Sequence, residues 1–316
     1  MTLDHILLFR DIAASRSISK ASELNEISQS AASQHLQELE RQWGVELVDR
    51  TTRPIALTPA GRRYYEFCRE TARLYQEFQD ELEQLKGSTE GRCRVASIYS
   101  VGLSELVSLE RIFRQWHPES ELDVQYLQPA RVYEAILADR ADLGLVSYPE
   151  PRRELTLTPW RNERMMAAMC PGHRLAGRPE IRAEDLAGED FIGFDPDLPV
   201  SREVRRYLRE AGVEVELVTT FDNIQSMKEA VTQGHGLSLL PEPILRPDLE
   251  QRRLVAIPLA APGLFRPLGI VRLKRKRLNR ASESFLSLLT GAAKTLRATP
   301  SPAGPNAPAD QGLQGA

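Results

Sequence analysis

The sequence has few cysteines and no long apolar run. Cys68, Cys93 and Cys170 are widely spaced and form no CxxC or Cys/His cluster, so we expect isolated reduced thiols rather than a zinc site or a disulfide framework. No stretch reaches the roughly 18 uninterrupted apolar residues of a membrane span. The N-terminus has no basic region followed by an apolar core. We therefore expect a cytoplasmic protein without a membrane partner.

Catalytic signatures are also missing. The sequence contains no GxSxG, Walker or GxGxxG pattern. Its five histidines show no metal-ligand spacing, and they are His5, His35, His117, His173 and His235. We predict neither an enzyme nor a cofactor or a metal site, although a Ser/His/Asp arrangement brought together by folding stays open at this point.

An excess of positive charge is absent as well. The 316 residues carry 41 basic and 44 acidic side chains, a net charge of −3, and the first 58 hold six basic and eight acidic residues. Bulk charge therefore does not indicate nucleic-acid binding, and any such function must depend on where individual side chains point. The length fits two or three domains.

The first 43 residues have the periodicity of three helices. Apolar residues at helical spacing predict a helix over 3–14, Ser17 or Ser19 can cap a short second helix with Leu24 facing inward, and Ser28 can cap a third over 29–43. One face of the third helix should turn to the core, and it carries Ala32, Leu36, Leu39 and Trp43.

The opposite face of the third helix is polar without being charged: it carries Gln29, Ser30, Ser33, Gln34 and Gln37. Amide and hydroxyl groups can donate to and accept from base edges in the major groove. Residues 45–48 and 55–57 predict a two-stranded wing with Arg50 and Arg53 near its tip, where they can meet phosphate. Spacing alone is also compatible with any small α+β domain.

The motifs in this region resemble the N-terminal signature of the LysR-type transcriptional regulators. The resemblance lies in SISKASELNEISQSAASQHLQELERQW at 18–43, followed by GVELVDRTTRPIALTPAG at 44–61. The sequence departs from the family pattern at three positions. Val48 stands where the family often has Phe, and His35 and Gln37 stand where it often has basic residues. The resemblance implies a winged helix-turn-helix DNA-binding domain over 1–58, with the helix-turn-helix at 18–43 and the wing at 45–57. The residues expected to contact promoter DNA are Ser28, Gln29, Ser30, Ser33, Gln34, Gln37, Arg50 and Arg53.

A long helix without internal proline is expected over 59–86. Its apolar residues recur at about seven-residue spacing, and the expected dimer seam is formed by Tyr64, Phe67, Leu74, Phe78 and Leu82. The alternative is a helix that packs only on its own domain. The family uses this helix to dimerise, which implies a homodimer, assembled further as a homotetramer. Residues 87–91 are expected to form a hinge.

From residue 92 the pattern alternates between strands and helices, including a helix over 103–116 and a strand over 164–170, as in parallel α/β folds. The motifs DLGL at 142–145, PGHRL at 171–175 and GHGLSLLP at 234–241 resemble the same family's effector domain, which is periplasmic-binding-protein-like. The resemblance implies an effector-binding domain over 92–297. Its first lobe comprises 92–160 and 268–297, and its second lobe comprises 161–267.

Ligands of such folds bind between the lobes, at strand ends and helix N-termini. The effector-contacting residues nominated on this basis are Ser97, Ile98, Tyr99, Ser100, Gln128, Arg131, Ser147, Asp195, Ser201 and Asn223. Each taken singly is more readily explained by a capping or turn role, and the set as a whole points to a ligand. Hydroxyls, free amides and Arg131 suggest a small acid or oxyanion.

The fold class expected is therefore multidomain: a mainly α winged helix-turn-helix, a long linker helix and a two-lobed α/β domain. The partners are promoter DNA, a small-molecule effector and, for an activator, RNA polymerase. The tail at 298–316 is expected to be disordered. Two alternatives fit less well. A free-standing solute-binding protein would not explain residues 1–86. A redox sensor of the same family would need a pair of cysteines in the sensing region, and the second lobe has only Cys170.

Overall fold

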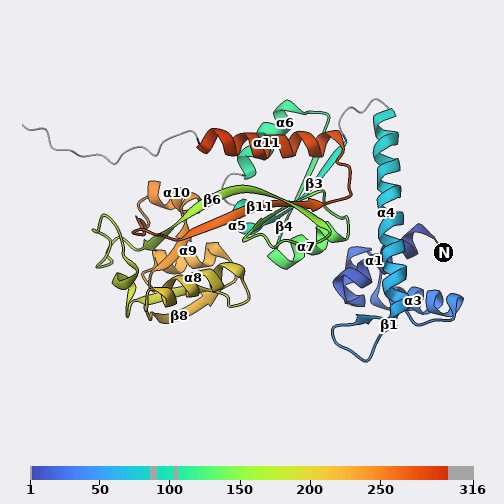
Figure 1. Cartoon of the computed structure of the whole chain (residues 1–316), viewed down its shortest axis with the longest axis horizontal. Helices are drawn as coiled ribbons and strands as arrows, with labels where there is room; N and C mark the ends of the chain where they lie inside the picture. The colour runs from blue at the N-terminus through green and yellow to red at the C-terminus, as the bar shows by residue number, and fades with distance from the viewer. Residues whose placement is uncertain (1, 86–90, 103–105, 298–316) are drawn as a thin grey trace, which may run out of the picture.

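The computed structural model describes residues 2–85, 91–102 and 106–297. In these ranges the chain forms a helical N-terminal domain (residues 2–58), a long helix α4 (Pro59–Leu85) and an α/β domain (residues 91–297), as Figure 1 shows. The predicted hinge, apart from Gly91, and the predicted tail lie outside the described residues. The fold class expected from the sequence is confirmed.

The N-terminal domain is built as its capping residues predict. Ser17 accepts a hydrogen bond from the backbone of Lys20, Ser28 accepts one from Ala31, and Gly44 ends the third helix in a left-handed conformation. Phe9 and Leu36 lie in the core. The elements are α1 (Leu3–Ser15), α2 (Ile18–Leu24), α3 (Gln29–Trp43) and the hairpin strands β1 (Val48–Asp49) and β2 (Ala56–Leu57).

Two details of this domain differ from the prediction. The hairpin strands are shorter than expected. Trp43 and Leu24, both expected in the core, are 42% and 45% exposed. Each is the last residue of its helix, where the chain turns outward, and Trp43 meets the ring of Tyr64 edge-on at the domain surface.

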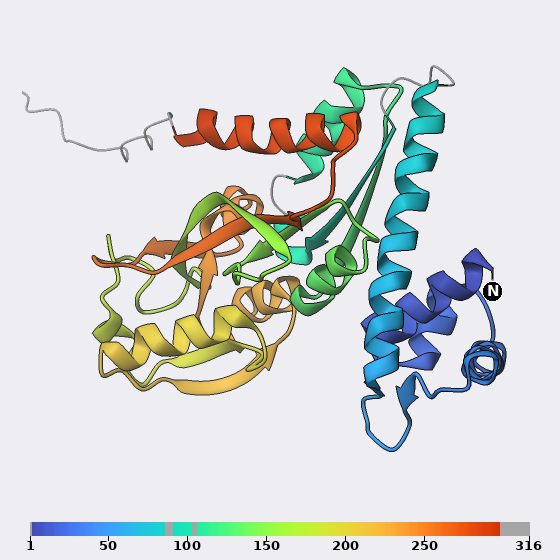
Figure 2. The ribbon, with the colours of Figure 1, turned by 45° about the vertical axis from the view of Figure 1, so that its right-hand side comes forward.

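Helix α4 begins on the N-terminal domain and continues beside the α/β domain (Figure 2). Thr58 accepts a hydrogen bond from the backbone of Gly61 in its first turn. An added Cβ at Gly61 would lie 1.8 Å from the carbonyl oxygen of Leu47, so only glycine allows this approach. The second turn buries Tyr64 in the core of the N-terminal domain. This part of α4 is therefore firmly anchored there.

The α/β domain contains two cores, which define a first and a second lobe. The first lobe surrounds a sheet in which three strands are parallel, and β11 runs antiparallel to them. These strands are β3 (Arg92–Ile98), β4 (Glu121–Leu127), β5 (Leu143–Ser147) and β11 (Phe265–Leu273). Its helices are α5 (Tyr99–Val101), α6 (Val107–Trp116), α7 (Pro129–Leu137) and α11 (Arg280–Arg297).

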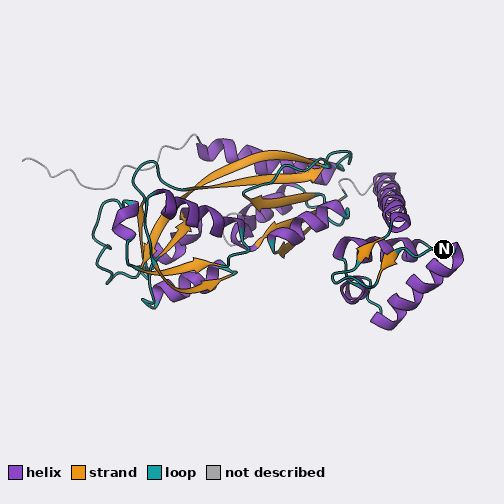
Figure 3. Ribbon diagram, turned by 60° about the horizontal axis from the view of Figure 1, so that its bottom comes forward, coloured by secondary structure: helices purple, strands orange, loops and turns teal. Residues whose placement is uncertain are grey.

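The long strand β6 (Leu155–Met169) continues from the first lobe into the second. There it pairs with β9 and β10, while β7 and β8 form a parallel pair (Figure 3). The remaining strands are β7 (Asp190–Phe194), β8 (Glu216–Phe221), β9 (Ser238–Pro241) and β10 (Val255–Pro258). The helices of this lobe are α8 (Pro199–Glu210), α9 (Ile224–Thr232), α10 (Glu242–Glu250) and the 3-10 turn Ala183–Leu186.

The two cores divide β6 between Trp160 and Met165. At the start of β11 the division falls between Leu264, just before the strand, and Leu268 within it. These two antiparallel strands are the connection between the lobes. The strand expected over 164–170 is only the far half of β6. In the α/β domain the sequence prediction also missed α10, because Pro243 and Pro247 lie within it.

Candidate functional site

The polar face of α3 is largely exposed. Gln29, Gln34 and Gln37 are exposed, Ser33 is half-buried, and none of them forms a side-chain hydrogen bond there. Ser28 caps the helix and lies 2.9 Å from Ser30. The apolar face opposite is buried, which fixes the polar face outward. This face can therefore offer amide and hydroxyl groups to a ligand at no cost in internal hydrogen bonds.

The two wing arginines are in different situations. Arg50 donates to Glu40 on α3 over 2.8 Å, and the same carboxylate accepts the backbone amides of Leu47 and Val48. Arg53 is exposed and has no ion-pair partner in the described part of the chain. The wing thus presents one cation held by the protein and one that is available to an external phosphate.

The apolar stripe on α4 continues beyond the N-terminal domain. Phe67, Leu74 and Phe78 are each about half exposed, at 46%, 53% and 54%, and Leu82 is also exposed. Tyr64, nominated with them, is only 3% exposed because Phe9 and Trp43 cover it. Four of the five stripe residues are therefore accessible to a second chain, and Tyr64 lies beneath them.

Four nominated effector residues lie together where β3 ends and α5 begins. Ser97 is fully buried and its hydroxyl donates to the backbone of Ile98, whereas Tyr99 is 54% exposed and stacks on Tyr126. The hydroxyl of Ser100 accepts a hydrogen bond from Arg266 at 2.9 Å. Tyr99 and Ser100 are therefore the members of this group that face outward.

The other first-lobe nominees lie at the ends of β4 and β5. Gln128 is exposed at the start of α7 and makes no capping hydrogen bond. Arg131 is bound to Glu134 one turn along α7, at 2.7 Å. Ser147 is the buried last residue of β5. The charge of Arg131, nominated as an anion clamp, is thus balanced within its own helix.

The second-lobe nominees are engaged in local hydrogen bonds. Asp195 accepts from the backbone of Asp197, the Ser201 hydroxyl donates to the carbonyl of Phe194, and Asn223 caps α9 by accepting from Ser226. Ser201 is buried, while Asp195 and Asn223 are partly exposed. These contacts are the capping and turn roles that the sequence left open for them.

A buried ion pair that was not expected from the sequence lies beside Ser100. Arg266 on β11 and Glu163 on β6 are 2% and 6% exposed, and the guanidinium binds the carboxylate through two nitrogens, one of them at 2.8 Å. The third nitrogen of Arg266 donates to Ser100. This pair therefore ties the two crossing strands to the end of β3. The residues are 103 positions apart, so no local pattern could have indicated it.

The cysteines and possible metal ligands do not gather into a further site among the described residues. Burial raises the pKa values of Cys68 and Cys93 to about 12, so both are thiols rather than thiolates at neutral pH. Cys170 is partly exposed and unpaired. Among the described residues, no cluster of His, Cys, Asp and Glu is suited to a metal ion, and no helix is long and apolar enough to cross a membrane.

Two protein families match the two parts of the chain. Residues 3–62 match the bacterial regulatory helix-turn-helix proteins of the lysR family, and residues 86–294 match the LysR substrate binding domain. Together these matches cover the N-terminal domain, the first turn of α4 and nearly all of the α/β domain.

Individual relatives match over almost the whole chain. The regulator CysL of Bacillus subtilis is 27% identical over 92% of this chain and 97% of its own. The RuBisCO operon regulator of Allochromatium vinosum is 26% identical over 90% and 94%. Among solved structures, HinK from Pseudomonas aeruginosa has a TM-score of 0.61 at 24% identity, covering 93% of this chain and 99% of its own. A full-length OxyR variant from the same organism has a TM-score of 0.64 at 16% identity, covering 93% and 95%.

Proposed function

Because the chain belongs to the LysR family of transcription regulators, we propose that it reads its promoter through the polar face of α3 and responds to a small anion held between its lobes. The general activity follows from the family: the protein is a DNA-binding regulator with a helix-turn-helix and an effector-binding domain, and it is not an enzyme. The proposal concerns the residues, the effector class and the assembly.

The observation that carries the DNA-reading proposal is the set of unbonded polar groups on α3. Gln34 and Gln37 are exposed near the middle of the helix, and Ser33 lies on the same face, one turn before Gln37. In the major groove a glutamine can pair with adenine through two hydrogen bonds, and a serine can pair with several bases. Arg53 would add phosphate contact from the wing. Specificity therefore resides in α3, while the wing contributes mostly affinity.

The exposed stripe of α4 supports self-association. Phe67, Leu74 and Phe78 lie on one face of a helix whose first turns are fixed to the N-terminal domain. Pairing of this stripe with that of a second copy would bury the exposed half of each of these three side chains, a gain of roughly 1 kcal/mol for each. It would also present two α3 helices to two half-sites about one turn of DNA apart. We expect a homodimer that assembles further into a homotetramer.

The proposed effector region is the outward-facing group at the end of β3. Tyr99 supplies an exposed ring, and Ser100 supplies a hydroxyl held by the buried Arg266. Gln128 and Arg131 stand at the next strand end. We propose a small acid or oxyanion, bound through hydroxyl and amide donors more than through a free charge, because both nearby arginines already have carboxylate partners. An activator would in addition contact RNA polymerase.

A DNA-binding measurement tests the α3 assignment. The double variant Ser33→Ala/Gln34→Ala should lower affinity for the promoter site by about 1–3 kcal/mol per lost base contact, with no change in affinity for unrelated DNA. The control is Gln42→Ala, an exposed glutamine at the other end of the same helix. Fluorescence anisotropy on the intergenic region beside this gene gives both values. Unchanged promoter affinity of the double variant would overturn the assignment.

A thermal-shift screen tests the effector proposal. Small carboxylic acids and oxyanions should include at least one that raises the melting temperature of the full chain, because a ligand that binds only the folded state stabilises it. Ser100→Ala and Arg131→Ala should each weaken that stabilisation. Wild-type responses in both variants would place the effector elsewhere.

A further inference from the structure

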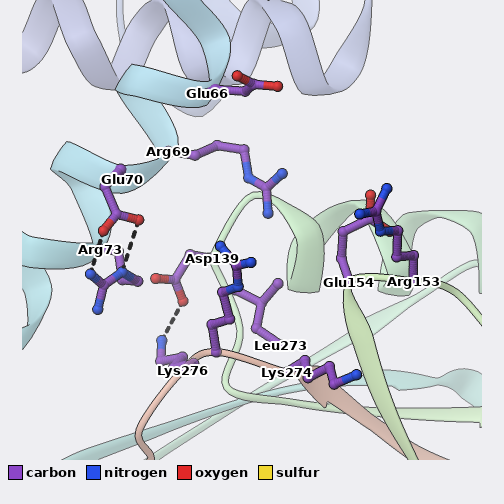
Figure 4. Close-up of a pocket in the computed structure, with 11 residues that line it drawn as sticks. Glu66, Arg69, Glu70, Arg73, Asp139, Arg153, Glu154, Leu273, Lys274 and Lys276 are labelled. Atoms are coloured by element: carbon purple, nitrogen blue, oxygen red, sulfur yellow. Dashed lines mark hydrogen bonds and ion pairs between the residues drawn. The ribbon is translucent and has the colours of Figure 1, made fainter. Parts of the chain in front are cut away.

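A large cavity lies between α4 and the first lobe, away from the effector region proposed above (Figure 4). Its volume is about 1000 Å³. Its walls come from α4, from the segment before β6, and from the end of β11 with the residues that follow it. Small-molecule sites in proteins commonly measure about 300–1,000 Å³. The cavity is thus large enough for a ligand of nucleotide size.

The cavity is lined by cations that the protein itself leaves without counter-charges. Arg69, Arg153, Lys274 and Arg275 form no ion pair with any described residue. Arg69 projects from α4 toward the first lobe in Figure 4 and lies over the ring of Tyr65. Four positive charges from three separate segments therefore line one space.

The acidic residues of the cavity compensate for little of this charge. Glu66 and Glu70 bind Arg63 and Arg73 of their own helix, and Asp139 is bound by the buried Lys276. Glu154 alone among the lining carboxylates lacks an ion-pair partner in the described ranges. The Arg73 hydrogen bond lowers the pKa of Glu70, and the charges of Arg275 and Arg69 contribute to that shift. Four unpaired cations thus face one unpaired carboxylate.

A neighbouring cavity, which shares Asp139 with the first, shows the contrasting arrangement. It is also lined by arginines, but Arg10 and Arg140 bind Asp11, Arg92 binds Asp123, and Arg94 binds Asp142. Its positive charges therefore all have carboxylate partners. The excess charge beside Arg69 is a property of that one cavity and not of the α4 contact in general.

We propose that this cavity, lined by Arg69, Arg153, Lys274 and Arg275, is a second ligand site, which binds a small polyanion carrying two or more phosphate groups. A phosphate ester group carries about 1.5–2 negative charges at pH 7, so two phosphates match the three uncompensated positive charges. Arginine forks suit phosphate oxygens in geometry, and a cavity lined by one sign of charge concentrates counter-ions. The ligand touches α4 on one side and the effector domain on the other, so its binding holds the two together.

Calorimetric titration of the full chain with sodium triphosphate, at constant ionic strength and without divalent cations, tests the proposal. The wild-type chain should bind one triphosphate per chain with saturation, and sodium sulfate should bind more weakly. The variant Arg69→Gln/Arg275→Gln should bind triphosphate at least about tenfold more weakly, a loss of ~1.4 kcal/mol. A second pair, Arg153→Gln/Lys274→Gln, should show a similar loss, which guards against misfolding of either variant.

Three controls separate this site from others. Arg111→Gln/Arg209→Gln removes two exposed arginines elsewhere on the α/β domain and should leave triphosphate affinity unchanged. Glu154→Gln should tighten binding by about threefold, because it removes the unpaired carboxylate. Ser33→Ala/Gln34→Ala should bind triphosphate normally, so failure of the DNA-reading assignment does not affect this test.

Several results would overturn the proposal. Triphosphate could fail to bind the wild-type chain at millimolar concentration, or it could bind equally well to both cavity variants. Sedimentation velocity could show that either cavity variant changes the oligomeric state without ligand, in which case a second copy of the chain occupies the cavity. A loss of affinity for unrelated DNA confined to these variants would assign the cations to the DNA backbone.

Discussion

The polar side chains of α3 and those nominated between the lobes have the same chemistry but differ in what the protein does with them. On α3, Gln29, Gln34 and Gln37 form no side-chain hydrogen bonds within the described chain. In the second lobe, Ser201 and Asn223 hydrogen-bond to nearby backbone. A polar residue in a sequence therefore says little about its availability until its partners are known.

This difference has an energetic meaning. A side chain without internal partners exchanges water for a ligand, whereas an engaged side chain must first give up a hydrogen bond worth about 0.5–1.5 kcal/mol. The α3 face is thus ready for a ligand at no structural cost. The engaged residues of the α/β domain contribute to its stability instead, and this contrast leads to four predictions.

The largest effect is expected at Asp142, a buried carboxylate that binds both Lys276 and Arg94. Asp142→Asn should lower the free energy of unfolding by about 3 kcal/mol, because it removes one of the two buried carboxylates, Asp142 and Asp139, that Lys276 and Arg94 share. Gln34→Ala, on the free side of the comparison, should change stability by less than about 0.5 kcal/mol. Denaturant unfolding of both variants measures this. Equal losses of unfolding free energy in the two variants would show that engaged and free polar side chains do not differ in their contribution to stability.

Low pH should weaken the ion pairs that Asp142 forms with Lys276 and Arg94. Burial alone would raise the pKa of Asp142, but Lys276 and Arg94 more than offset it and lower that pKa to about 2, below the ordinary 3.8. Its stabilising contribution, about 2 kcal/mol, is therefore complete above about pH 5 and is lost as the pH falls toward 2. Melting temperatures of the wild type and Asp142→Asn should converge between pH 5 and pH 2.5. Parallel curves would contradict this assignment.

A smaller effect is expected at Asn223, the N-cap of α9. Asn223→Ala should cost about 1 kcal/mol of stability, and Asn223→Asp should retain the cap and most of the stability. If Asn223 serves only as a cap, the response to any effector stays unchanged in the Asp variant. A stable Asp variant without an effector response would instead show that an engaged side chain also contacts ligand.

The smallest effect concerns the two wing arginines. Arg53→Gln should weaken binding to all DNA sequences and reduce the dependence of log affinity on log salt by about one unit, because it removes one phosphate contact. Arg50→Gln should change the salt dependence less, because Glu40 already neutralises Arg50. Anisotropy titrations at several salt concentrations compare them. A larger change of salt dependence in Arg50→Gln than in Arg53→Gln would show that Arg50, and not Arg53, makes the main phosphate contact.

Much of the fold could be predicted because its signals are local. The cap at Ser28, the apolar spacing of α3 and the glycine at position 44 together define a helix from adjacent residues. The prediction failed for α10, where Pro247 obscures the helical pattern, and for the near half of β6. The core position expected for Trp43 was wrong. Helical periodicity predicts which face of the helix a residue lies on, but it does not show where along the helix the core ends.

The candidate sites also differ in whether their residues are close together in the sequence. The polar face of α3 could be predicted, since its residues lie within one helix and helical spacing alone places them together. The pair Arg266–Glu163 could not be predicted, and neither could the cavity beside Arg69, because their residues come from segments far apart in the chain. The effector residues at strand ends were predicted from the expected topology. The sequence did not indicate that several of them form local hydrogen bonds within the protein.

The sequence by itself determined the family, the class of fold and the face of α3 that is turned outward. These depend on motifs and on periodicity, which adjacent residues encode. Only the tertiary structure decided which charged and polar groups meet. It paired Asp142 with Lys276 and Arg266 with Glu163, and it left Arg69 and Arg275 facing a cavity without counter-charges. The physical reason is that the energies of charges depend on distance and burial in space, and the order of residues along the chain specifies neither.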